Sequence, residues 1–272
     1  MPLQYLASIK FSSTYAPYRL TAQDDVADAI EGIYQFELAD FNCHVALFND
    51  GYPALMIMPN PSMVSACHVG EQYISLGSMW FTAGVLRRAI WQPGQYNGML
   101  TVIRFYPGVW QRLTGKPAVQ FPFVHDLATY APTFSRQCIR FYDEPRIDLS
   151  IHNLLAQIMK NGRDNVPIDK PWKKLLEYPN DPHAREDYCL SKKGYYSKSV
   201  QRLFKRTMGL GPYQFEQLHR FLRAFYNLKE NKNVGLHEMA FLCGYYDANH
   251  LIKDFKKYVG KSPRLFLLQE TV

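Results

Sequence analysis

Apolar and polar positions follow two different patterns along the chain, and the change falls near residue 143. Before it, short stretches of aromatic and β-branched residues alternate with Gly, Pro and Asn, a pattern typical of strands joined by turns. The stretches expected to be strands are 41–48, 54–58, 73–81 and 99–106. Their spacing favours a small barrel or sandwich. Segment 21–36 instead has helical spacing, with an acidic first turn that favours a helix start.

Beyond residue 143 the apolar spacing becomes helical. A helix is expected over 146–160, and it either mediates dimerisation or packs on its own N-terminal domain. Four prolines over 161–183 then indicate a linker. We therefore expect an α+β chain of two domains, with a β-rich barrel or sandwich over 1–142, a connecting helix and linker over 143–182, and an all-helical domain over 183–272.

Charge separates the same two parts. Residues 183–272 contain 16 Lys and Arg against 8 Asp and Glu, whereas residues 1–182 contain 15 against 16. All of the excess positive charge thus lies in the last third, which indicates a module that binds a polyanion.

Composition excludes several other classes. With 47% apolar residues the chain can bury a core, yet no apolar run approaches the length of a membrane span, so no membrane is expected. The N-terminus lacks a basic segment followed by an apolar one, so secretion is not expected. Five scattered cysteines without a CxxC pair argue against a disulfide scaffold and for the reducing cytoplasm.

The last segment has the order of parts of a helix-turn-helix. A short helix over 236–242 is followed by Gly244, which can turn the chain, and by Asp247, a good N-cap for a second helix. The second helix should bury Leu251 and Phe255. Its free face carries Asn249, His250, Lys253, Lys256 and Lys257.

A second copy of this unit precedes it over 191–215. Aligning Phe204 with Phe255 also aligns a glycine, a proline and an aromatic residue, namely Gly209 with Gly260, Pro212 with Pro263 and Phe215 with Phe266. The free face of this earlier helix carries Lys198, Gln201, Arg202, Lys205 and Arg206. Between the two units, residues 212–231 should form one helix of about 25 Å. With half the thickness of each flanking unit added, the basic helices would lie about one turn of DNA apart, near 34 Å.

Residues 183–268 resemble the C-terminal DNA-binding domain of AraC/XylS-type transcription regulators. The residues that carry the resemblance include Gln201-Arg202-Leu203-Phe204, Gly211-Pro212, Met239-Ala240, Cys243-Gly244-Tyr245, Asn249-His250-Leu251 and Ser262-Pro263. The N-terminal half more weakly resembles the β-rich sensor domains of such regulators, through Tyr15-Ala16-Pro17, Asn49-Asp50-Gly51 and 104–108. The chain departs from the family at one position, because the family's usual capping Ser aligns with Tyr196, while Ser197 lies one place later. The first recognition helix therefore either starts one residue late or is capped differently.

The resemblance implies roles for the basic faces. Base contacts are expected from Lys198, Gln201, Arg202, Asn249, His250 and Lys253, with Ala248 also at a base-facing position. Phosphate contacts are expected from Lys205, Arg206, Lys256, Lys257 and Lys261. The implied protein is a cytoplasmic regulator that binds operator DNA. Its partners would be a small effector in the N-terminal domain, a second copy of the chain and, if it activates, RNA polymerase.

Other chemistries have weaker support, and no catalytic residue, metal or cofactor is expected. Cys43-His44 and Cys67-His68 invite a metal site, but neighbours in a strand point to opposite faces. A nucleophile with His125 and Asp126 lacks any supporting motif. The aromatic residues of the first half could line a pocket or fill a core. Two other functions stay open, namely a sequence-indifferent architectural DNA-binding protein and an enzyme with an accessory DNA-binding domain.

Overall fold

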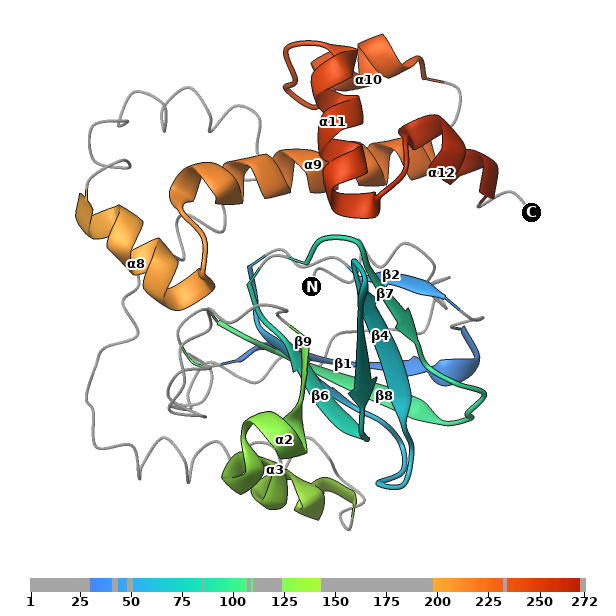
Figure 1. The fold of residues 1–272 in the computed structure, drawn as a ribbon, viewed down its shortest axis with the longest axis vertical. Helices are drawn as coiled ribbons and strands as arrows, with labels where there is room; N and C mark the ends of the chain where they lie inside the picture. Colours follow the sequence, from blue (N-terminus) through green and yellow to red (C-terminus); the bar gives the residue numbers. More distant parts are fainter. Residues whose placement is uncertain are drawn as a thin grey trace.

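A computed structural model shows a β-rich N-terminal region and a helical C-terminal region, which confirms the expected fold class (Figure 1). The structure describes residues 30–40, 44–47, 51–84, 86–106, 109, 124–142, 198–231 and 234–269. The predicted helix over 146–160 and the predicted linker lie outside these residues. Within the described segments, no helix is long and apolar enough to cross a bilayer.

Two antiparallel sheets form the N-terminal region. The larger sheet has the strand order β1-β8-β3-β6-β9 and the smaller has the order β2-β7-β4-β5. Their bounds are β1 Ile30–Glu37, β2 Val45–Leu47, β3 Ala54–Ile57, β4 Ser65–Val69, β5 Gln72–Leu76, β6 Met79–Thr82, β7 Ala89–Gln92, β8 Met99–Phe105 and β9 Val124–Asp126. Because side chains alternate along a strand, each sheet can bury one face in a shared core.

The larger sheet is buried on both faces. One face meets the smaller sheet, and there Trp80 and Trp91 lie with ring centroids 5.3 Å apart. The other face is covered by helices α2 (Leu127–Tyr130) and α3 (Pro132–Cys138), whose Phe134 joins the core with Phe81. A three-residue 3-10 helix follows β1 at Leu38–Asp40, and a second, Ile139–Tyr142, follows α3. The N-terminal region is therefore a sandwich with a helical layer outside it.

The predicted helix over 21–36 is wrong where the structure describes it. Residues Ile30–Glu37 form strand β1, which pairs with β8 in a register that joins Ile33 to Ile103 and Phe36 to Leu100. Tyr34 and Phe36 are buried, so the period of two and the pairing with β8 outweigh the local helical spacing.

The other predicted strands are confirmed with changed bounds. Segment 73–81 is two strands, β5 and β6, because Gly77 and Ser78 turn between them and the Gly77 N–H donates to Asp126 Oδ2 at 2.8 Å. Strands β4, β7 and β9 were not predicted, and each has only three to five residues. Such short strands give too little alternation to be recognised.

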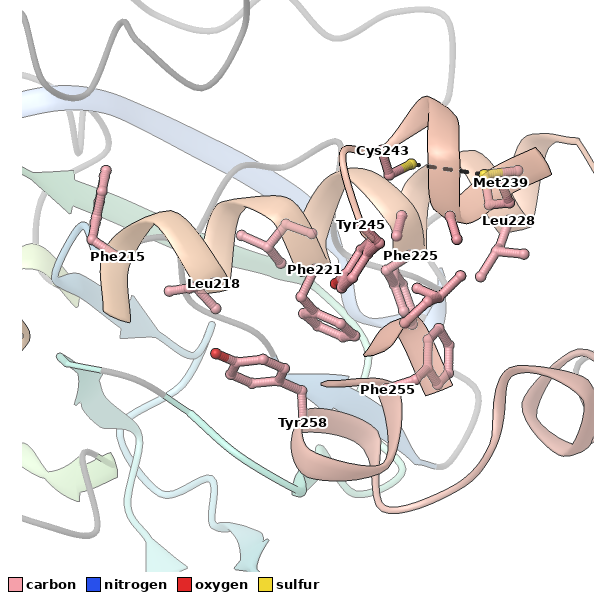
Figure 2. Close-up of a cluster of buried hydrophobic side chains, with 14 of the residues drawn as sticks. Phe215, Leu218, Phe221, Phe225, Leu228, Met239, Cys243, Tyr245, Phe255 and Tyr258 are labelled. Atoms are coloured by element: carbon pink, nitrogen blue, oxygen red, sulfur yellow. Dashed lines mark hydrogen bonds between the residues drawn. The ribbon is translucent and has the colours of Figure 1, made fainter. Parts of the chain in front are cut away.

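Five helices lie in the described part of the C-terminal region, and α9 runs through its middle (Figure 1). They are α8 Lys198–Met208, α9 Pro212–Glu230, α10 Leu236–Leu242, α11 Ala248–Val259 and α12 Pro263–Gln269. Figure 2 shows aromatic side chains of α9 meeting those of α11 in one core. Phe221 stacks on Tyr258 at 4.4 Å between centroids, and Phe225 stacks on Phe255 at 5.7 Å.

The buried aromatic rings of this core should carry much of the stability of the helical region. We expect Phe255→Ala to lower the free energy of unfolding by about 3–5 kcal/mol, because Phe255 is 0% exposed and its loss leaves a cavity. Phe241→Ala is the matched control, since Phe241 is 83% exposed and its loss should change stability by less than about 0.5 kcal/mol. Urea unfolding followed by the helical circular dichroism signal measures both; equal losses would contradict this packing.

Candidate nucleic-acid interface

The second predicted unit is present with the expected turn. Helix α10 ends at Leu242, and Gly244 follows in the left-handed region at φ 78°. The Tyr245 N–H then donates to the Ala240 carbonyl at 2.8 Å, which closes the end of α10. Asp247 caps the next helix as predicted, because its Oδ1 accepts from the His250 N–H at 2.7 Å. The sequence therefore fixes both ends of the turn that orients α11.

Helix α11 divides into a buried and an exposed face. Leu251, Phe255 and Tyr258 are buried against α9. The exposed face carries predicted DNA-contacting residues, namely Asn249, His250, Lys253 and Lys256, with Lys261 exposed just beyond the helix. Ala248, which the resemblance placed at a base-facing position, is buried. Five of the predicted side chains at this unit are thus available to a ligand.

A polar cluster also holds α11 against α9. The Arg220 guanidinium lies 3.5 Å from Asp254 Oδ2 and 4.4 Å from the centroid of the Tyr245 ring. These contacts join α9, the turn after α10 and the inner side of α11. Burial raises the pKa of the Tyr245 hydroxyl, so its ring serves here as a neutral partner for the cation.

Helix α8 has the same division. Phe204 and Met208 are buried, and Phe204 meets Phe215 of α9 edge to face at 5.6 Å between centroids. Its exposed residues include the predicted Lys198, Gln201, Arg202, Lys205 and Arg206. The segment before Lys198, with Tyr196 and Ser197, lies outside the described residues. The cap of α8 therefore stays a prediction.

The two units end in the same way, as their sequence repeat predicts. Gly209 after α8 and Gly260 after α11 have φ of 74° and 88°, where glycine is favoured. The N–H of each donates to a carbonyl four residues earlier at 3.0 Å, from Gly209 to Lys205 and from Gly260 to Lys256. Helices α9 and α12 then start at Pro212 and Pro263. The sequence repeat therefore corresponds to a repeat in the structure.

Lys257 differs from the other predicted phosphate-binding residues. Its Nζ donates to Gln217 Oε1 at 3.5 Å and lies 5.1 Å from the centroid of the Tyr258 ring, so it is half-buried at the α9–α11 contact. Burial and the charge of Arg87 lower the pKa of Lys257. The base and phosphate roles of all these residues stay predictions.

Candidate sites in the N-terminal region have structural roles. Burial raises the pKa of the Cys67 thiol to about 12, so this thiol stays protonated at neutral pH. Asp126 caps α2 through Thr129, and His125 stacks on Tyr130 at 4.4 Å. Among the described residues no group of three or more His, Cys, Asp or Glu could hold a metal ion. Cys43 lies outside those residues.

Sequence reasoning missed the contact between the two regions. Gly51 approaches so closely that a Cβ there would lie 3.1 Å from the Phe215 ring of α9. Tyr52 and Tyr106 pack against the helical core, and the Arg104 guanidinium lies 4.5 Å from the Tyr52 ring centroid. In the sequence, the Asn49-Asp50-Gly51 motif supports only the resemblance to sensor domains, and no sequence pattern predicts its contact with α9.

Comparison with known proteins assigns the C-terminal helices. Residues 191–269 match a family described as a helix-turn-helix domain. The C-terminal third of the chain is therefore a DNA-binding helix-turn-helix domain. It is of the type found in AraC/XylS regulators, so the resemblance is confirmed for this part of the chain. No curated protein matches the chain.

Solved structures to which the chain is similar include ToxT from Vibrio cholerae. One ToxT structure has 9% identity and a TM-score of 0.41, over 87% of this chain and 98% of that chain. ToxT of strain O395 has 10% identity and a TM-score of 0.41, over 87% and 95%. Fatty-acid-bound ToxT of strain SCE256 has 10% identity and a TM-score of 0.40, over 87% and 93%.

The cap of α11 can be tested by one substitution. We expect Asp247→Ala to lower the free energy of unfolding by about 1 kcal/mol, because the His250 N–H loses its acceptor. Asp247→Asn is the matched control, since its side-chain oxygen still accepts and should retain most of the stability. Urea unfolding compares the three proteins. If the alanine variant is as stable as the parent, Asp247 does not cap α11.

Proposed function

We propose that this chain is a sequence-specific DNA-binding transcription regulator of the AraC/XylS type, in which α8 and α11 enter successive major-groove segments. The observation that carries the proposal is the equivalence of the two helices. Each presents an exposed basic face, and each ends in the same turn of glycine and proline. A helix fits the major groove of B-form DNA, and amide and basic side chains can distinguish base edges there.

The packing of both helices on one long helix supports simultaneous binding. Helix α9 has 19 residues, and both helices pack on it, α8 through Phe215 and α11 through Phe221 and Phe225. At 1.5 Å per residue α9 is about 28 Å long. One turn of DNA is about 34 Å. Phe215 and Phe225 are about 15 Å apart along α9, so α8 and α11 would span the rest of that distance by extending outward from α9.

Within each helix we assign roles by position. Lys198, Gln201 and Arg202 of α8 would contact bases, as would Asn249, His250 and Lys253 of α11, because these lie in the first half of each helix. Lys205, Arg206, Lys256, Lys257 and Lys261 lie later in each unit and would bind phosphates. Lys257 would first have to leave Gln217.

For the N-terminal region we propose a regulatory role. Residues 1–142 would form the sensor domain, residues 143–182 the connection and residues 183–272 the DNA-binding domain. The protein would act in the cytoplasm by binding and not by catalysis. A small effector, a second copy of the chain and, for an activator, RNA polymerase are its proposed partners. The direct contact of Gly51 and Tyr52 with the helical core supports communication between the two domains.

An architectural DNA-binding protein is the second candidate, favoured by the excess of basic residues alone. Selection of bound duplexes from a random pool by the full chain, followed by competition with random DNA at fixed salt, separates the two. A regulator should return a preferred sequence that outcompetes random DNA by about a thousandfold or more. Equal competition would refute sequence-specific binding and leave the architectural role.

Arg202 tests the assignment of base contacts. We expect Arg202→Ala to weaken binding to the selected duplex by about 1–3 kcal/mol and to relax preference at one base pair, because a bidentate contact to guanine is lost. Arg206→Ala is the matched control on the same exposed helix face. It should weaken selected and random duplexes alike and make the salt dependence shallower by about 0.9. Unchanged binding and preference in Arg202→Ala would refute the role of α8.

A further inference from the structure

The N-terminal domain reaches the C-terminal end of recognition helix α11. The segment between β6 and β7 contains Arg88, whose main-chain N–H donates to the Tyr258 carbonyl at 2.5 Å. The carbonyl of Arg88 accepts from the Gly70 N–H at 3.1 Å, in the turn between β4 and β5. Since the last carbonyls of a helix lack partners within the helix, Arg88 completes the end of α11 from another domain.

The backbone of Arg88 is held in an unfavourable conformation. Arg88 has a φ of 51°, and it is the one described residue other than glycine with a positive φ. This conformation costs energy for a residue with a Cβ, so it persists only where the surroundings fix it. The two main-chain hydrogen bonds of Arg88 provide that fixation, and they determine where its side chain starts.

The side chain of Arg88 continues the exposed face of α11. Residues Asn249, Lys253, Lys256 and Gly260 follow one another at spacings of four, three and four, so they share one side of the helix. A Cβ at Gly260 would lie 3.6 Å from both Cγ and Cδ of Arg88. The stem of the exposed arginine therefore covers the position at which this row ends, and its Nε would lie 3.8 Å from the same Cβ, which puts a positive group at the end of the row.

Arg87 adds a second positive charge at the same place. Arg87 is exposed. Burial is the main cause that lowers the pKa of Lys257, and the charge of Arg87 is the second. The other charged groups that act on Lys257 are Arg220 and Asp254. Arg87 and Lys257 are therefore two like charges close to each other where the β6–β7 segment meets α11. A contact that served only to hold the domains together would be weakened by this repulsion, whereas a phosphate would relieve it.

We propose that Arg87 and Arg88 of the N-terminal domain bind DNA backbone phosphates next to the C-terminal end of α11. The inference rests on the proposed insertion of α11 into the major groove and extends the DNA interface beyond the helix-turn-helix domain. Arginine suits this role because its planar guanidinium can form two hydrogen bonds to one phosphate. Any change that moves the β6–β7 segment away from α11 would then weaken DNA binding directly.

The test is the salt dependence of DNA binding by the full chain. Affinity for a random-sequence duplex and for the selected duplex is measured by fluorescence anisotropy between about 50 and 200 mM KCl. The variant combines Arg87→Gln with Arg88→Asn, because asparagine tolerates the left-handed conformation and keeps the N–H that binds Tyr258. We expect roughly tenfold or greater weakening on both duplexes at about 0.1 M salt and a slope shallower by about 1.8, or 0.9 for each lost contact.

Two further variants keep the result interpretable. Arg136→Gln removes an exposed arginine from α3, which lies on the side of the sheets away from the C-terminal helices, and it should leave affinity and slope unchanged (Figure 1). Arg87→Lys with Arg88→Lys keeps both charges and should restore most of the slope. Thermal unfolding of each variant confirms that the chain is folded.

The outcomes are distinct. The inference is overturned if the Arg87→Gln, Arg88→Asn variant has the affinity and the salt slope of the wild type. It is also overturned if the variant binds more weakly with an unchanged slope, because the β6–β7 segment would then act only by supporting α11. The proposed function fails differently, if the wild-type chain prefers no sequence. The change in slope on random DNA can still be measured in that case.

Discussion

The packing of α9 against both basic helices is the constraint on which the DNA-binding domain depends. The buried face of α9 meets α8 through Phe215 and Phe204, and meets α11 through Phe221, Phe225 and Phe255. One rigid helix therefore fixes the directions in which two exposed faces point. The ion pair of Arg220 with Asp254 adds a polar link on the α11 side. Without this core the same basic residues would be an unordered positive surface, able to attract DNA but not to read it.

Helical periodicity and turn chemistry predicted most of this domain. Asp247 as a cap, Gly209 and Gly260 as left-handed turns, and the apolar stripe from Phe215 to Leu228 are local signals, because each depends on residues within two helical turns. The division of α8 and α11 into buried and exposed faces follows from the same spacing. The repeat could be found because it conserves the order of turn residues even though most other residues differ.

The N-terminal domain was less predictable, because its structure is set by pairing between distant segments. Strand β1 carries a local helical pattern, yet Ile30–Glu37 pairs with Met99–Phe105, about seventy residues away. The approach of Gly51 to Phe215 and the bond from Arg88 to Tyr258 join segments more than 160 residues apart. No sequence pattern encodes such a contact. The proposed role of Arg87 and Arg88 in phosphate binding therefore depends on the structure, which brings the two domains together.

The central claim is that two helices on one rigid domain occupy neighbouring grooves of one duplex. Hydroxyl-radical footprinting of the full chain on its selected duplex tests this most directly. The proposed binding mode predicts two protected patches on the same face of the DNA, with centres about 10 base pairs apart. A single patch, or two patches on opposite faces of the duplex, would contradict it.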